Sequence, residues 1–208
     1  MQQQARIFAK TGRAIGSFST ALAVLFFTLH AAAGEIFESE AQVATPVDVP
    51  TPIAESFERN LSHAEKECLT DSKTTAKGAL EAARLDLGGS VPALLLKPRG
   101  PTEPQAAWGC FCGAHACPMW IYASETAAPH RILSTAGDSL EIIDRQDNGM
   151  KRLLVSGGSA GQQAVELYAW GGQEYKVLRK KAIRLGRGDD ADERAKQDLV
   201  KFRADAIR

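Results

Sequence analysis

The chain has 208 residues, which suits one domain with a tail, and its 25 basic and 25 acidic residues balance. A chain without a basic excess lacks the electrostatic footprint of general nucleic-acid binding, so we expect no nucleic-acid partner. The sequence contains neither a phosphate-binding loop nor a dinucleotide-binding glycine fingerprint. No cofactor is therefore expected.

Residues 1–33 have the pattern of a secretory signal peptide. Three basic residues and no acidic one open the stretch, residues 21–29 are apolar, and Ala31-Ala32-Ala33 offers a small-residue cleavage site. The apolar run is shorter than the roughly 17–25 residues that a membrane span needs. The sequence predicts a periplasmic or secreted protein, cleaved near Ala33, with no transmembrane segment after cleavage. The mature chain would carry 22 Lys and Arg against 25 Asp and Glu.

All four cysteines follow this leader, in a compartment that permits disulfides. Four cysteines allow three pairings, and the sequence does not choose among them. Cys112 and Cys117 can close a small loop, which leaves Cys110 for Cys68, and we favour this pairing. The alternative is a metal-binding or redox-sensing module made by Cys110, Cys112, His115 and Cys117, since zinc and copper select thiolate and imidazole ligands. Oxidising conditions and the tight spacing of these ligands argue against it.

The first part of the mature chain changes character near residue 55. Residues 34–54 are acidic, aperiodic and rich in proline, which predicts a disordered or extended lead-in. Phe57, Leu61, Ala64 and Cys68 then recur three or four residues apart. This spacing predicts one short amphipathic helix over 55–69 that covers a sheet.

Strand patterns begin near Leu80. Residues 80–87 alternate, a glycine turn follows, and residues 92–97 are apolar enough for a central strand, although helix is a rival over 77–83. Proline-rich residues 97–105 predict a loop, and 119–122 a strand. A hairpin is expected from strands at 131–134 and 139–143, followed by a polar turn at 144–149 and a strand at 151–155. A flexible loop at 157–161 then leads to a second hairpin, whose strands at 164–170 and 174–178 are joined by a turn at Gly171-Gly172.

The expected fold is mainly β, or α+β, with an antiparallel meander, a short N-terminal covering helix and a charged C-terminal helix. Leu199, Phe202 and Ile207 are the apolar docking residues of that last helix. We expect a signal peptide at 1–33, a lead-in at 34–54, a β-rich domain at 55–178 and the charged helix or tail at 179–208.

Four aromatic residues are candidates for a binding surface. Side chains alternate along a strand, so Trp120 shares a face with Tyr122, and Tyr168 shares a face with Trp170. Tyrosine and tryptophan are favoured anchors for protein ligands, and such a surface could also hold a sugar. The alternative is that these faces belong to the core.

Two stretches share a plan of an acidic, glycine-bearing turn before an apolar strand: one starts at Asp86 and the other at Asp144. Together with the Cys112-Gly-Ala-His-Ala-Cys117 loop and the strand at Trp120, this resembles short exported bacterial proteins with degenerate FG-GAP or VCBS turns. The resemblance implies calcium-binding turns, but calcium needs about six oxygen ligands. The first turn keeps only Asp86. The second keeps Asp144, Asp147 and Asn148, with Arg152 where another acid would help, so we expect weak calcium binding at most.

The catalytic patterns are incomplete. Residues 157–161 match a nucleophile elbow around Ser159, but a strand follows instead of a helix, and no histidine follows His130. A triad of His115 or His130 with Asp138 and Ser159 has no support from spacing. The Arg187-Gly-Asp189 triplet is interpreted as chance. The sequence therefore favours a non-enzymatic binding or structural role in the cell envelope, with a protein or polymer partner; it determines neither the ligand nor the oligomeric state.

Overall fold

The computed structural model describes residues 35–89, 92–100, 107–113, 116–123, 129–159, 161–184 and 189–207, which belong to one compact unit. These residues form two antiparallel sheets and five helices, so the prediction of a mainly β fold is confirmed. The first sheet has the order β2-β3-β4-β5 and the second the order β1-β6-β7-β8-β9. The strands are β1 (Ile36–Glu38), β2 (Leu80–Leu85), β3 (Ala93–Pro98), β4 (Cys117–Ala123), β5 (His130–Gly137), β6 (Ser139–Asp147), β7 (Met150–Ser159), β8 (Gln162–Trp170) and β9 (Tyr175–Arg184). The helices are α1 (Thr51–Arg59), α2 (His63–Asp71), α3 (Ala76–Ala79), α4 (Trp108–Phe111) and α5 (Asp189–Ile207).

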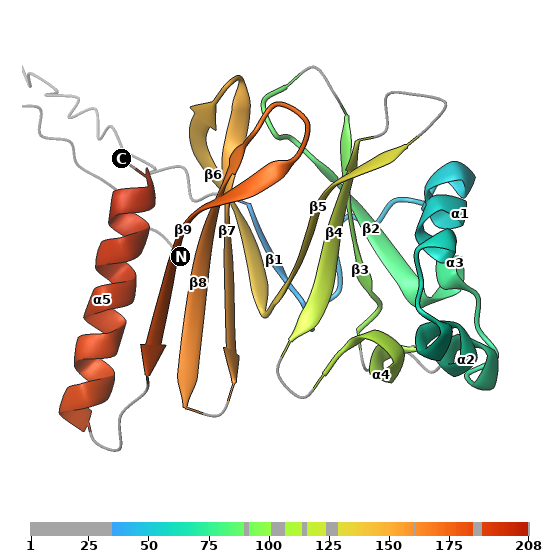
Figure 1. Ribbon diagram of the computed structural model, residues 1–208, viewed down its shortest axis with the longest axis horizontal. Coiled ribbons are helices and arrows are strands. Elements are labelled where there is room, and N and C mark those ends of the chain that lie inside the picture. Colours follow the sequence, from blue (N-terminus) through green and yellow to red (C-terminus); the bar gives the residue numbers. More distant parts are fainter. Residues whose placement is uncertain are drawn as a thin grey trace, which may run out of the picture. The chain divides into compact units, whose positions relative to one another are not determined.

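The two sheets pack against each other, and helices cover the outer face of each (Figure 1). The central core combines side chains from the facing sides of both sheets. A second apolar cluster joins the four-stranded sheet to α1, α2 and α3, and a third joins the five-stranded sheet to α5. Each sheet is therefore buried on both faces over much of its area.

This layering explains the apolar run at 92–97. Side chains alternate along β3, so Leu95 enters the central core while Leu94 and Leu96 pack under the helices. Strand β3 pairs with β2 on one side and β4 on the other. The prediction of a central strand is confirmed, because a strand with both faces covered favours apolar residues along most of its length. Lys97 is the exception in β3, and it is buried with Glu81 as its partner.

The predicted hairpin of 131–134 and 139–143 is wrong. Strand β5 pairs with β4 and β6 pairs with β1 and β7, so the chain changes sheets at Asp138. Glycines permit the close crossing: a Cβ on Gly137 would lie 2.6 Å from the Ser156 oxygen, and one on Gly157 would lie 3.0 Å from the Gly137 Cα. The flexible loop expected at 157–161 is also wrong, since 157–159 belong to β7.

The predicted meander is confirmed as β6-β7-β8-β9. The turn predicted at 144–149 is too long, because residues 144–147 belong to β6. Asn148 and Gly149, with φ of 51° and 81°, form the two-residue turn between β6 and β7. The two-residue turn expected at Gly171-Gly172 is wrong. Trp170 pairs with Tyr175 across a four-residue loop.

Residues 34–54 are not a disordered lead-in where the structure describes them. They include β1 and the buried side chains of Phe37, Val43 and Val49. A buried ion pair between Lys97 and Glu81 holds this segment. The Lys97 ammonium also donates to the backbone oxygens of Ser39 at 3.1 Å and Ala41 at 2.6 Å, and the Val43 amide donates to Glu81 at 3.2 Å.

The single helix predicted over 55–69 is two helices. Helix α1 begins at Thr51 and ends at Arg59, and α2 begins after Ser62. The Ser62 hydroxyl accepts from the Glu65 amide while the Glu65 carboxylate accepts from the Ser62 amide, which is a capping box. This cap starts a new helix and breaks the predicted one. Phe57 and Leu61 are buried, as expected, but Ala64 is exposed.

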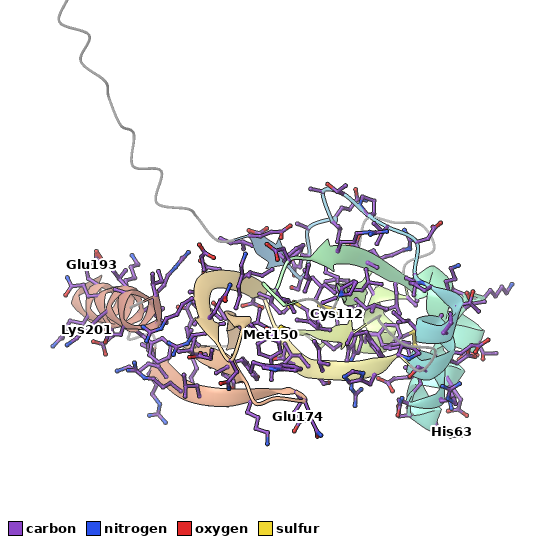
Figure 2. All side chains as sticks on the ribbon, turned by 90° about the horizontal axis from the view of Figure 1, so that it is seen from above. His63, Cys112, Met150, Glu174, Glu193 and Lys201 are labelled. Carbon is purple, nitrogen blue, oxygen red and sulfur yellow. A yellow bond between two sulfur atoms is a disulfide. The ribbon has the colours of Figure 1, made fainter. Side chains whose placement is uncertain are left out.

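The charged C-terminal helix is confirmed as α5, but it begins later than residue 179 because β9 continues to Arg184. Phe202 is buried and Leu199 is half-buried, whereas Ile207 is 55% exposed and Ala206 is buried in its place. Glu193 and Lys201 point away from the sheets (Figure 2). The Arg-Gly-Asp triplet begins outside the described residues.

Candidate functional site

Both favoured disulfides are present. Cys68 and Cys110 are bonded with their Cα atoms 5.5 Å apart, and Cys112 and Cys117 with theirs 4.3 Å apart. None of the four sulfurs is a thiolate in this state, so the zinc or copper alternative requires reduced protein. His115 lies outside the described residues. Among those that the structure does describe, no cluster of three or more His, Cys, Asp or Glu could hold a metal ion.

The first aromatic pair is core rather than surface. Trp120 packs edge-on against Phe57, with ring centroids 4.7 Å apart, and against Phe111 at 6.0 Å. Tyr122 is fully buried in the same cluster, and burial raises the pKa of its hydroxyl. The helices that cover this sheet therefore exclude Trp120 and Tyr122 as binding residues.

Tyr168 is also interior. Its hydroxyl donates to the Glu166 carboxylate at 2.5 Å and lies 3.1 Å from the Thr135 hydroxyl of the other sheet. Lys180 pairs with the same carboxylate. Burial, and then the bond to Glu166, raises the pKa of Tyr168 to about 12. Tyr168 thus links the two sheets through its hydroxyl.

Trp170 differs from the other three candidates because it is half-buried and lines an open hollow. Its ring meets Tyr175 edge-on, with centroids 5.4 Å apart, and packs against the central core. The hollow, called here the Trp170 hollow, has a volume of about 720 Å³. It is lined by Gly89, Ala123, His130, Ile132, Asn148, Gly149, Met150, Trp170, Gly172 and Gln173.

Both sheets build the Trp170 hollow. The four-stranded sheet contributes the end of β4 and the beginning of β5, and the five-stranded sheet contributes the β6–β7 turn and the end of β8. The Asn148 amide donates to the Trp170 backbone oxygen at 3.3 Å, which ties the turn to the tryptophan strand. On the opposite wall Gly89 leaves room for Met150, since a Cβ there would lie 2.4 Å from its sulfur.

The lining of the Trp170 hollow combines one tryptophan ring with a few polar side chains. No Asp, Glu, Lys or Arg is among its described lining residues. Its polar side chains are the exposed imidazole of His130 and the exposed amides of Asn148 and Gln173. An aromatic ring surrounded by a few polar groups is the usual composition of a small-molecule site, and 720 Å³ lies within the common range.

The candidate calcium turns are occupied by cations of the protein. Arg152 binds Asp147 through two nitrogens, one of them 3.0 Å from Oδ1. Lys151 lies 3.0 Å from Asp86 and 3.7 Å from Asp144, so the two similar turns of the sequence meet at one ammonium. Calcium would have to displace these cations.

We expect Asp147→Asn to lower the free energy of unfolding by about 1 kcal/mol at pH 7. The hydrogen bond from Arg152 holds the pKa of Asp147 below its ordinary 3.8. A carboxylate whose folded pKa is lowered stabilises the fold above its ordinary pKa, and that stability is lost as pH falls. The difference between variant and wild type should therefore shrink below about pH 4, measured by urea unfolding. Asp144→Asn is the matched control, expected to change stability by less than about 0.5 kcal/mol; an equal loss in both variants would contradict the assignment.

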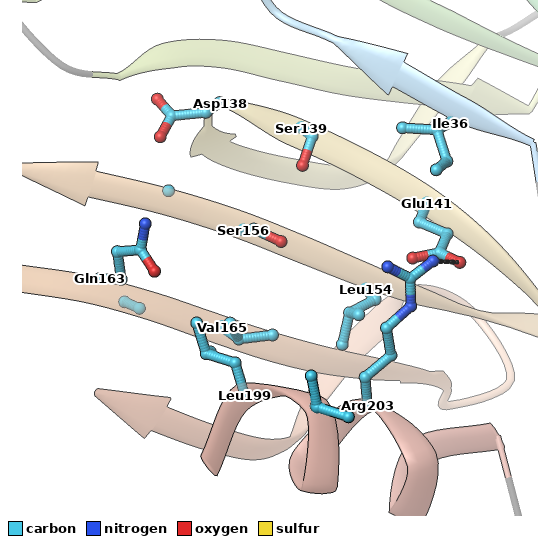
Figure 3. Close-up of a pocket in the computed structure, with 13 residues that line it drawn as sticks. Ile36, Asp138, Ser139, Glu141, Leu154, Ser156, Gln163, Val165, Leu199 and Arg203 are labelled. Carbon is cyan, nitrogen blue, oxygen red and sulfur yellow. Dashed lines mark hydrogen bonds and ion pairs between the residues drawn. The ribbon is translucent and has the colours of Figure 1, made fainter. Parts of the chain in front are cut away.

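A second hollow of about 320 Å³ lies between α5 and the outer face of the five-stranded sheet (Figure 3). Arg203 reaches from α5 to Glu141 of β6 at 2.6 Å. Ile36 and Val200, which are 50% and 69% exposed, are among its lining residues. The charged pair spans from the helix to the sheet, so its evident role is to hold α5 in place.

The structure does not bring together the candidate triad that uses His130, and the alternative with His115 lies outside the described residues. His130 opens β5 and Asp138 follows its end, about 26 Å apart at about 3.3 Å per residue. Ser159 ends β7, which leads into β8 rather than a helix.

Scans against protein-family models, curated proteins and solved structures found no match for this chain. The likeness to FG-GAP and VCBS turns stays a prediction. Among the described helices, none has the length and apolar character to cross a membrane.

Proposed function

We propose that this chain is an exported, disulfide-bonded domain that binds a component of the cell envelope at the Trp170 hollow, without catalysis. The observation that carries the proposal is the half-buried Trp170 ring in an open hollow between the ends of two sheets. A tryptophan that keeps part of its ring accessible beside neutral polar groups is a typical anchor for a ligand.

Two features support export. Residues 1–33 have the pattern of a cleaved secretory signal, and the four cysteines of the remaining chain form two disulfides. Disulfides persist in the periplasm and outside the cell, whereas cytosolic thiols are kept reduced.

Binding is favoured over catalysis by the composition of the Trp170 hollow. His130 is the one titratable side chain among its described lining residues. Acid–base catalysis needs a positioned donor or acceptor beside the reacting atoms, and nucleophilic catalysis needs a nucleophile paired with a base. The described lining offers no such pair, but it does offer an aromatic contact and three polar side chains.

The test is retention of the protein on isolated cell envelopes. We expect Trp170→Ala to lower the retained fraction at least fivefold, because the variant lacks the aromatic contact. Trp108→Ala is the matched control, since Trp108 is the other half-buried tryptophan and lies on α4, away from the hollow. Circular dichroism must show both variants folded. Equal retention of wild type and Trp170→Ala, or recovery of the wild type from the cytosol with its leader intact, would contradict the proposal.

A further inference from the structure

We propose that the ligand of the Trp170 hollow is a neutral carbohydrate chain. This inference rests on the proposed function and adds the chemical class of the ligand. It follows from the charge, the hydrogen-bonding groups and the aromatic contact that the hollow presents.

The described lining contains no Asp, Glu, Lys or Arg, which favours an uncharged polymer over an acidic or a basic one. An acidic polymer or an acidic peptide would need a cation in the hollow, and a basic partner would need a carboxylate. Charged residues that neighbour the lining in sequence pair with other charged residues of the protein. Lys151 is bound to Asp86 and Asp144, and Arg152 is bound to Asp147. Glu174, which follows Gln173, lies 4.0 Å from Lys176. A buried or half-buried ligand charge without a partner is costly. A neutral ligand avoids that cost.

The polar side chains match hydroxyl groups. A sugar hydroxyl donates one hydrogen bond and accepts others. The amides of Asn148 and Gln173 likewise have both a donor and an acceptor, and the imidazole of His130 adds a third hydrogen-bonding side chain. These three side chains are exposed and come from three segments, the β6–β7 turn, the β8–β9 loop and the start of β5. They can therefore meet hydroxyls on different sides of one ring.

The remaining requirement is a flat apolar surface for the C–H face of the sugar. The half-buried Trp170 ring is the aromatic group of the described lining that can supply it, and the edge-on contact with Tyr175 restricts the orientation of that ring. Two glycines of the lining, Gly149 and Gly172, have no neighbouring atom within 4 Å of the place that a Cβ would take, so the rim at both turns is open. An open rim allows a chain to enter and continue beyond the hollow.

The experiment measures binding of neutral and acidic oligosaccharides to the full mature chain by tryptophan fluorescence and calorimetry. The neutral probes are oligomers of glucose, galactose and N-acetylglucosamine, and the acidic probe is oligogalacturonate. We expect saturable binding of at least one neutral oligomer, with affinity that rises with chain length. Gln173→Ala and His130→Ala should each weaken it at least fivefold, and Trp170→Ala should abolish it.

Gln163→Ala is the control, because Gln163 is an exposed glutamine in the hollow beside α5. The affinity of the Gln163→Ala variant for the neutral oligomer should equal that of the wild type. Binding of the acidic oligomer alone, or neutral binding that Gln173→Ala and His130→Ala leave unchanged, would overturn the carbohydrate assignment. If the wild type stays on envelopes through Trp170 but protease treatment of the envelopes releases it and no oligosaccharide binds, the proposed function stands and the carbohydrate assignment fails.

Discussion

Replacing Lys97 with methionine should lower the free energy of unfolding by about 3–5 kcal/mol, the loss typical of breaking a buried ion pair. The Lys97 and Glu81 side chains are only 1% and 6% exposed. Methionine fills a similar volume but leaves the Glu81 carboxylate buried without its cation. The backbone oxygens of Ser39 and Ala41 also lose the hydrogen bonds that the Lys97 ammonium donates. Urea unfolding followed by circular dichroism measures the change.

The double variant Lys97→Met/Glu81→Met separates charge from packing. It removes both charges, so it should be more stable than Lys97→Met alone even though it has one more substitution. The segment at 39–43 should exchange its amide hydrogens faster in both variants, because its anchor is gone. A Lys97→Met protein within about 1 kcal/mol of wild type would show that the pair does not hold the segment.

Removing the Cys68–Cys110 disulfide by a double alanine substitution should cost about 4 kcal/mol, and removing Cys112–Cys117 about 2 kcal/mol. The difference follows from loop length, since the bonded residues are separated by 42 and 5 positions. A bond that closes a longer loop removes more conformational entropy from the unfolded chain. Thermal and urea unfolding of the two double variants measure the two losses.

The two disulfide variants control for each other, because each removes one bond and keeps the other. Mass spectrometry without reductant should find the mature wild type four hydrogens lighter than its reduced form and each variant two hydrogens lighter. A larger loss for the short loop than for the long one would contradict the entropic account. Free thiols in the wild-type protein isolated without reductant would contradict the pairing itself.

Local patterns were sufficient for much of the β architecture. The apolar run of β3 and the alternation in β8 each identify their element from a few neighbouring residues. The predicted turn at 144–149 contains the observed one at Asn148-Gly149. The disulfide pairing was favoured on similar grounds, because Cys112 and Cys117 can close a short loop. The strand, turn and Cys112–Cys117 predictions succeeded because the pattern that identifies each lies in a short stretch of chain. The Cys68–Cys110 pair, separated by 42 positions, followed only by elimination.

The wrong predictions have a common cause: each concerns a segment whose pairing or packing partner lies elsewhere in the chain. The predicted hairpin at 131–143 failed because its two strands alternate well but pair with different sheets. The lead-in at 34–54 is fixed by a buried ion pair whose members, Lys97 and Glu81, lie far along the sequence. Only the close approach of Gly137 and Gly157 shows why the glycines of 157–158 belong to a strand rather than a loop.

The sequence by itself determined the class of fold, the order of the meander strands and the pairs of aromatic residues that share a strand face, because these depend on local periodicity. Only the tertiary structure decided which aromatic residue is accessible. Trp120 and Trp170 have similar strand contexts, yet helices cover the first and the open ends of two sheets leave the second half-buried. The accessibility of a side chain depends on which distant part of the chain packs against its face of the strand. Alternation along one strand shows which residues share a face but does not show what covers that face.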